Sequence, residues 1–181
     1  MTLAEKVAVL LAAAGHPHAV IGAMAMAVHG ISRGTADFDF MVGDPEVLKA
    51  DLWAELASTG ASVVIRKGDV GDPLAGVVRI EAPGDLPVDV VVFGGLGWQR
   101  EAALRAETAM LDGARMPVVR PADLVLLKLY AGGPQDAWDI EALLSASTAR
   151  DALCREVESR LARLPSRSRR LWTRITSPTS R

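Results

Sequence analysis

The sequence contains little that could crosslink the chain or bind a soft metal. Its 181 residues include one cysteine, Cys154, so no internal disulfide can form, and a reducing cytoplasm is the expected location. One cysteine and three scattered histidines also exclude a Cys/His metal cluster. Aromatic residues make up only 4% of the chain, although half of its residues are hydrophobic. The core must therefore consist mainly of Val, Leu, Ala and Met.

No hydrophobic run is long enough to cross a bilayer. The apolar stretch at residues 7–14 has eight residues, whereas a membrane-spanning helix needs about 20. Glu5 and Lys6 precede it, and it lacks the basic start and cleavage site of a signal peptide. The stretch predicts an amphipathic first helix over residues 3–14, and we expect no membrane partner.

The order of the predicted elements indicates an α/β (α+β) fold. Strands are predicted at residues 18–22, 36–42, 62–66, 77–81, 87–93, 109–111 and 116–118. Helices are predicted at residues 3–14, 23–29, 45–58, 98–107, 121–130, 135–144 and 150–164. Because the strands come first and most of the helices follow, we expect a mixed sheet flanked by helices over residues 1–120 and a helical portion over 121–164.

Charge is distributed unevenly along the chain. Residues 1–154 carry 12 basic and 20 acidic side chains, a net charge of −8, whereas residues 155–181 carry eight arginines and two glutamates, a net charge of +6. Residues 165–181 are predicted to form a flexible, Arg-rich tail. This C-terminus could bind the phosphate backbone of RNA, or it could lie on the chain's own acidic surface.

The stretch at residues 20–42, VIGAMAMAVHGISRGTADFDFMV, contains the main candidate site. Side chains alternate between the two faces of a strand, so Asp37 and Asp39 share one face while Phe38 and Phe40 share the other. Two neighbouring carboxylates repel each other unless a cation or a partner lies between them. The pair therefore indicates a site for a divalent metal.

A third carboxylate, Asp89, lies in the predicted strand PVDVVVF. Its neighbours Val88 and Val90 face away from it, so the carboxylate is on the polar face of that strand. Beside Asp37 and Asp39 it would complete a site for one or two Mg²⁺ ions. Alternatively, these aspartates cap loops or pair with arginines such as Arg33 and Arg66.

The motif resembles the signature of the DNA polymerase β-like nucleotidyltransferase superfamily, especially its AbiEii-type toxin branch of minimal nucleotidyltransferases. The resemblance covers roughly residues 20–144 and implies a catalytic, metal-binding triad. It also implies a nucleoside triphosphate such as ATP as substrate, Mg²⁺ or Mn²⁺ as cofactor, and a toxin paired with an antitoxin. The residues that carry it are Gly22, Ala23, His29, Gly30, Arg33, Thr35, Asp37 and Asp39, with Asp89 as the third acid.

Four residues around the motif are candidates for binding the nucleotide. Gly22 allows close backbone approach, and the N–H groups that open the helix at Ala23 could point at a phosphate. The family has a serine or glycine where this chain has Ala23, so a phosphate-binding hydroxyl is absent. Arg33 and Thr35 could contact phosphate oxygens or could simply stabilise the turn.

A second cluster lies at residues 120–143. Lys128 interrupts an apolar helix, so its ammonium must reach solvent or an anion. By resemblance, Lys128 binds nucleotide phosphates, while Asp136 and Asp139, on one face of the next helix, position the nucleotide or acceptor. Gln135 stands where the family often has lysine. Asp136 is also explained as an acid favoured in the first turn of a helix.

Together these features predict a metal-dependent nucleotidyltransferase that moves a nucleoside monophosphate from a triphosphate to a hydroxyl and releases pyrophosphate. RNA, most of all tRNA, or a protein would be the acceptor. The first alternative is a transferase that modifies an antibiotic or a metabolite. The second, suggested by Ala23 and Gln135, is a non-catalytic nucleotide- or partner-binding protein.

Overall fold

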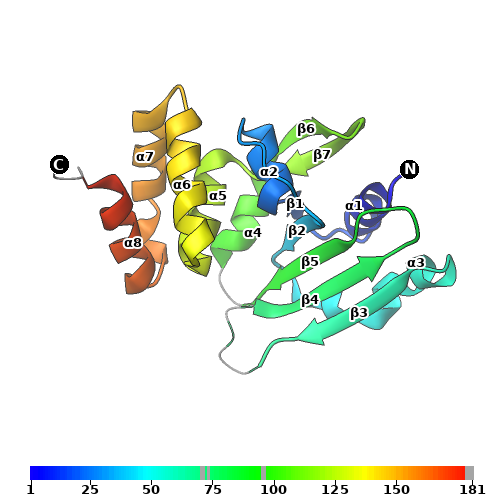
Figure 1. The fold of residues 1–181 in the computed structure, drawn as a ribbon. Coiled ribbons are helices and arrows are strands. Elements are labelled where there is room, and N and C mark those ends of the chain that lie inside the picture. The colour runs from blue at the N-terminus through cyan, green and yellow to red at the C-terminus, as the bar shows by residue number, and fades with distance from the viewer. Residues whose placement is uncertain (70–71, 73, 95–96, 178–181) are drawn as a thin grey trace. The chain divides into compact units, whose positions relative to one another are not determined.

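The structure is a computed structural model that describes residues 1–69, 72, 74–94 and 97–177. Contacts between residues divide the chain into two compact units. The first comprises Met1–Val28 and Arg33–Val119, and the second comprises His29–Ser32 and Arg120–Arg181. Figure 1 shows a sheet in the first unit and helices in the second.

The strands of the first unit form one mixed sheet in the order β3-β4-β5-β2-β1-β7-β6. Two pairs are parallel, β2 with β5 and β1 with β7, and the other neighbours are antiparallel. The predicted α/β class is confirmed. The strands are β1 (His18–Val20), β2 (Phe38–Val42), β3 (Ser62–Lys67), β4 (Leu74–Glu81), β5 (Val88–Phe93), β6 (Glu107–Leu111) and β7 (Ala114–Val118).

One face of this sheet is apolar and buried. Phe40 of β2, Val90 of β5 and Val78 of β4 are aligned across three neighbouring strands, and all three are 0% exposed. Leu48 lies over Gly76 on the same face, where a side chain in place of the glycine would meet the leucine methyl groups. Because side chains alternate, the residues between these core positions, including Asp39 and Asp89, are on the opposite face.

Helix α1 (Leu3–Ala13) confirms the first predicted helix. Thr2 caps it in a capping box with Glu5, and Leu3, Val7 and Leu11 are buried. Two further helices of this unit are α2 (Gly22–Val28) and α4 (Gly97–Leu104).

The prediction of one continuous helix over residues 45–58 was wrong. The segment forms two 3₁₀ turns, η1 (Pro45–Leu48) and η2 (Ala50–Trp53), followed by α3 (Ala54–Ser58). Lys49 is extended, with ψ of 130°, which breaks the helical repeat. The Trp53 indole donates a hydrogen bond to the Val47 carbonyl at 2.8 Å and stabilises this tight path. Leucines spaced four residues apart in this segment therefore predicted a longer continuous helix than the structure contains.

Two other boundaries differ from the prediction. The helix predicted to end at residue 107 ends at Leu104, and Glu107 begins β6 instead. The loop predicted at residues 67–76 is shorter because β4 already begins at Leu74, while residues 70, 71, 73 and Gly95 lie outside the described residues. The turn predicted at Asp112-Gly113 is confirmed, since both residues have positive φ, as tight hairpins require.

The second unit contains helices α5 (Pro121–Ala131), α6 (Pro134–Ala146), α7 (Arg150–Glu158) and α8 (Ser166–Thr176), with a 3₁₀ turn, η3 (Leu161–Arg163). Helix α5 packs against α6, α7 and α8, which explains its nearly continuous apolar sequence. The predicted helix over 150–164 ends at Glu158.

The Arg-rich segment that the sequence predicts as a flexible tail contains helix α8. Its Trp172 is only 3% exposed. Burial of this apolar side chain therefore stabilises a helix in a segment whose arginine content suggested a flexible chain. Trp138 of α6 is 56% exposed. Within the described ranges, no helix combines the length and the apolar character needed to cross a membrane.

Candidate active site

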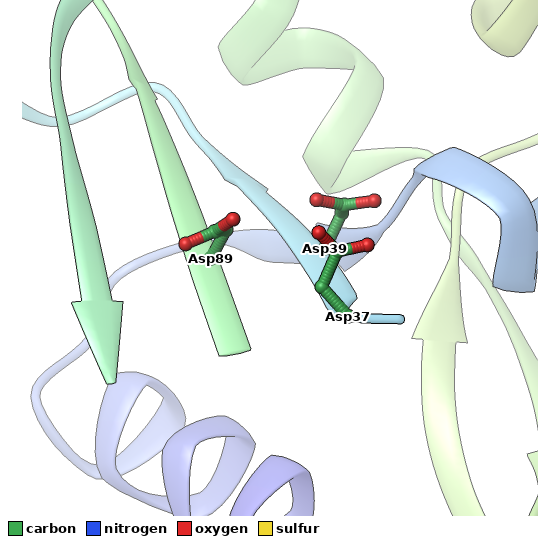
Figure 2. A group of neighbouring side chains, drawn as sticks. All are labelled: Asp37, Asp39 and Asp89. Atoms are coloured by element: carbon green, nitrogen blue, oxygen red, sulfur yellow. The ribbon is translucent and has the colours of Figure 1, made fainter. Parts of the chain in front are cut away.

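Three aspartates come together on the open face of the sheet in the first unit. Strands β2 and β5 are parallel neighbours, and their register sets Asp39 directly opposite Asp89. Asp37 precedes Asp39 by two residues and so lies on the same face. One carboxylate oxygen from each residue lies within 4.8 Å of the other two. Figure 2 shows the three side chains gathered on this face, as the sequence predicts.

Two neighbours hold the outer carboxylates in place. The Thr35 hydroxyl contacts both the main-chain oxygen of Asp37, at 2.9 Å, and its Oδ1, at 3.0 Å. On β4, Arg79 is aligned with Asp89 and donates from Nη1 to its Oδ2 at 2.8 Å. Arg79 also donates from Nε to Glu81 at 2.8 Å, which fixes the guanidinium between two acids.

Arg79 was missed by the sequence analysis, which offered Arg33 and Arg66 as partners instead. Its only sequence signal is its position in a strand, and that signal is meaningful only once β4 is known to pair with β5. Thr35 makes the turn-stabilising contact that was one of its two predicted roles. Its predicted contact with a phosphate stays a prediction.

The local charges act on Asp89 in opposite directions. Burial of the carboxyl raises the pKa of Asp89 above its ordinary value, and the negative charge of Asp37 raises it further. The positive charges of Arg79 and, to a smaller extent, Arg66 lower the pKa. Because the pKa stays raised on balance, Arg79 compensates only in part for the cost of ionising Asp89.

The triad fits a hard divalent cation. Oδ1 of Asp89 is buried and accepts no hydrogen bond from any described residue. Mg²⁺ prefers oxygen ligands at about 2.0–2.1 Å, so opposite ligands of one ion are about 4.2 Å apart. The three carboxylate oxygens lie within 4.8 Å of one another, so their separations are on the scale of such a site. Asp37, Asp39 and Asp89 are therefore the residues that could hold such an ion.

Position 22 requires glycine for two reasons, the conformation of its backbone and its close contact with Asp39. Its φ is +64°, which L side chains rarely adopt. A Cβ added at this position would lie 2.0 Å from Oδ2 of Asp39. The glycine thus lets the chain turn into α2 while the Asp39 carboxylate lies against it. The predicted approach of a phosphate to this backbone is a separate point and stays a prediction.

Ala23 and Arg33 are the other residues predicted near the nucleotide. Ala23 lies in the first turn of α2 and is 4% exposed, and Arg33 is half-buried in the segment that leads to β2. Their predicted contacts with phosphate stay predictions.

The residues of the second predicted cluster form a charged group within the second unit. Lys128 of α5 forms an ion pair with Asp139 of α6 and lies 3.4 Å from Oδ1 of Asp136. Lys128 is 7% exposed and Asp139 is 0% exposed. The other oxygen of Asp136 accepts from the Gly133 N–H at 2.9 Å and so caps the start of α6, in whose first turn the sequence placed it as a favoured acid. Each member thus has a structural function, whatever it binds in addition.

Comparisons with known proteins support the fold. No protein-family model matches the chain, and no curated protein matches it in sequence. The crystal structure of ANT(2'')-Ia in complex with adenylyl-2''-tobramycin matches at a TM-score of 0.54 and 14% identity, over 87% of this chain and 96% of that chain. The solution structure of the antibiotic-resistance factor ANT(2'')-Ia matches at 0.52 and 17% identity, over 88% and 91%.

An antigenic nucleotidyltransferase-like protein from Paracoccidioides brasiliensis matches at a TM-score of 0.47 and 18% identity, over 92% of this chain and 88% of that chain. The two stronger matches show that this chain has a nucleotidyltransferase-like fold. The AbiEii branch stays a prediction.

Gly22→Ala is expected to disturb the site and the fold together. The alanine would be strained at positive φ and would collide with Asp39, so the unfolding free energy should fall by about 1–3 kcal/mol. Mn²⁺ binding should weaken because the Asp39 carboxylate must move. Thermal unfolding and calorimetric titration with Mn²⁺ measure the two effects. Gly34→Ala is the control, since its Cβ would meet nothing within 4 Å and should change neither.

The pKa of Asp89 is expected to lie above its ordinary value in the metal-free protein. A raised pKa means that the folded state binds the proton more tightly, so the stability contributed by this group is lost as pH rises through that pKa. Asp37→Asn should lower the pKa of Asp89, and Arg79→Met should raise it. Carboxyl ¹³C NMR titration measures these values. Added Mg²⁺ should also lower the pKa, and a pKa of Asp89 at or below the ordinary value would contradict the electrostatic account.

Lys128→Met tests how much of the second cluster is structural. Removing the ammonium leaves the buried Asp139 carboxylate without its lysine, so we expect a loss of about 3–5 kcal/mol of unfolding free energy. Replacing both residues, as Lys128→Met/Asp139→Leu, should recover much of it. Lys49→Met is the control, because that lysine forms an exposed ion pair with Glu46 and should matter little. Unchanged stability with weaker nucleotide binding would instead make Lys128 primarily a ligand-binding residue.

Proposed function

We propose that this chain is a metal-dependent nucleotidyltransferase, which moves a nucleoside monophosphate from a nucleoside triphosphate to a hydroxyl and releases pyrophosphate. The observation that supports it most strongly is the register of β2 and β5, which brings Asp39 and Asp89 together beside Asp37 in a nucleotidyltransferase-like fold. A bound Mg²⁺ or Mn²⁺ would neutralise the triphosphate and favour ionisation of the attacking hydroxyl.

Each of the three aspartates offers carboxylate oxygens to such an ion. Asp37, held by Thr35, and Asp39, packed against Gly22, offer oxygens from two residues on one face of β2. Asp89 offers its unpartnered Oδ1, while Arg79 holds the other oxygen and keeps the carboxyl oriented. An acid oriented before the substrate arrives loses little further freedom, which favours catalysis.

The nucleotide-binding roles are proposed from the family resemblance. The backbone at Gly22 and Ala23, with Arg33 and Thr35, would contact the triphosphate. Lys128, Asp136 and Asp139 would position nucleotide or acceptor. Because Lys128 forms ion pairs with both acids in this structure, its part in phosphate binding would require exchange of one of those contacts.

RNA, most of all tRNA, is our first candidate for the acceptor, and the Arg-rich C-terminal residues support it. Eight arginines and two glutamates in residues 155–181 favour a polyanion. Within this function, a toxin that is paired with an antitoxin is the biological role that the AbiEii-type resemblance suggests.

Modification of an antibiotic is the second candidate. It is favoured by the fold likeness to ANT(2'')-Ia, whose crystal structure contains adenylyl-2''-tobramycin. A cationic antibiotic would require acids around the acceptor, whereas the C-terminal residues of this chain are strongly basic. A third reading, nucleotide binding without turnover, follows from Ala23 and Gln135.

Incubation with each α-labelled nucleoside triphosphate, Mg²⁺ and total cellular RNA tests the proposal. Wild-type protein should label RNA or itself with a subset of the triphosphates, which also identifies the nucleotide. Asp39→Asn should lower the rate at least about a hundredfold, because metal contributes several kcal/mol and about 1.4 kcal/mol is tenfold in rate. Asp51→Asn, which removes an exposed carboxylate outside the triad, is the control and should leave labelling unchanged.

The outcomes separate the three candidates. Label in RNA supports the first, and label only when an aminoglycoside such as tobramycin is added supports the second. Metal-dependent binding of triphosphate with no label in any acceptor supports the non-catalytic reading. For the toxin role, induced wild-type protein should arrest bacterial growth, and Asp39→Asn should relieve the arrest. Equal growth with both proteins would reject that role.

A further inference from the structure

A cavity of about 330 Å³ lies within the second unit between the end of α5 and one face of α8. Leu129 and Gly132 line it from the α5 side. The α8 side contributes Arg167, Arg170, Leu171 and Arg174. The spacing of the three arginines, three and then four residues, puts them on one face of the helix. The cavity is therefore lined by three cations and two leucines.

The positive charge of this cavity is not balanced by acids of the chain. No acidic side chain lines it, and none of its three arginines forms an ion pair within residues 1–69, 72, 74–94 and 97–177. Elsewhere in the unit, Arg160 contacts Asp123 at 2.8 Å and Glu156 at 2.5 Å. Like charges three or four residues apart destabilise a helix, so the three arginines carry a cost that an anion would offset.

All three arginines are exposed, and one of them is held by the protein. Arg167 donates from Nη2 to the Tyr130 carbonyl at 3.4 Å, and its guanidinium lies 6.0 Å from the centre of the Tyr130 ring. Arg170 and Arg174 are exposed. The cavity thus combines one oriented guanidinium with two that can turn toward a ligand.

We infer that this cavity binds successive backbone phosphates of a single nucleic acid strand. A guanidinium presents paired N–H donors that match phosphate oxygens. From Arg167 to Arg174 the helix rises about 10.5 Å, so guanidiniums spread over this length suit a row of anions better than a single one. A strand with a phosphate at each nucleotide provides a series of anions, and Leu129 and Leu171 provide apolar contact for its sugars or bases.

RNA and DNA share this phosphodiester chemistry. The choice of RNA rests on the proposed function, whereas the recognition of phosphates rests on the cavity alone. Binding can therefore be tested without turnover, and Asp39→Asn protein should bind the strand as well as wild type. Absence of labelling by the wild-type protein, with strand binding intact, would count against the proposed function and leave this inference standing.

Fluorescence anisotropy with a labelled single-stranded 20-mer, as RNA and as DNA, tests the inference across a series of NaCl concentrations. Arg170→Gln/Arg174→Gln should weaken binding about tenfold or more at 150 mM salt. It should also reduce the slope of log affinity against log salt by about 1.4, or about 0.7 for each lost contact with a single strand. Tighter binding of one oligonucleotide identifies the natural strand.

Arg155→Gln/Arg169→Gln is the matched control, because it removes the same charge from exposed arginines outside the cavity, one on α7 and one on α8. It should cause a much smaller loss and leave the slope nearly unchanged. Equal weakening by the two double variants, or no weakening by the cavity variant, would overturn the inference. So would displacement of the strand by an equal concentration of ATP or tripolyphosphate, which would indicate a site for small anions.

Discussion

The parallel pairing of β2 with β5 is the constraint on which the candidate active site depends. Its register sets Asp39 opposite Asp89, and the two-residue repeat of a strand adds Asp37 to the same face. The cost of this arrangement is electrostatic, as the raised pKa of Asp89 indicates. The apolar residues on the other face, such as Phe40 and Val90, stabilise the strands that bring the charges together.

Packing around the triad leaves little room for variation. Gly22 lies so close to Asp39 that any side chain at that position would collide with the carboxylate, and its positive φ lets α2 begin there. On the other side of the group, Arg79 lies between Asp89 and Glu81. One oxygen of Asp89 is thus fixed by the protein, while Oδ1 is available to a ligand. The contact with Arg79 therefore orients the Asp89 carboxyl but does not fully neutralise its charge.

The face on which each aspartate of the triad lies was predictable from sequence because it depends on local rules, whereas the meeting of Asp89 with Asp37 and Asp39 was expected from the family resemblance. Alternation along a strand set the face of Asp37 and Asp39, and the apolar neighbours of Asp89 set its orientation. Arg79 was not predictable, because its role follows from the pairing of β4 with β5, which is decided by packing between distant segments. For the same reason Trp172, buried against neighbouring helices, orders α8 in a segment whose composition suggested a flexible tail.

The acids of this chain differ in how far the protein itself balances their charge. Asp123 and Asp139 are both 0% exposed, and each forms an ion pair with a cation of its own unit, Arg160 and Lys128 respectively. Such pairs are costly to break and favour a single arrangement. In the triad, three carboxylates lie together, and Arg79 offsets only part of the cost of ionising Asp89. A ligand of opposite charge would offset the charge left uncompensated in the triad, and the α5–α8 cavity, whose exposed arginines have no acid beside them in the lining, favours an anion in the same way.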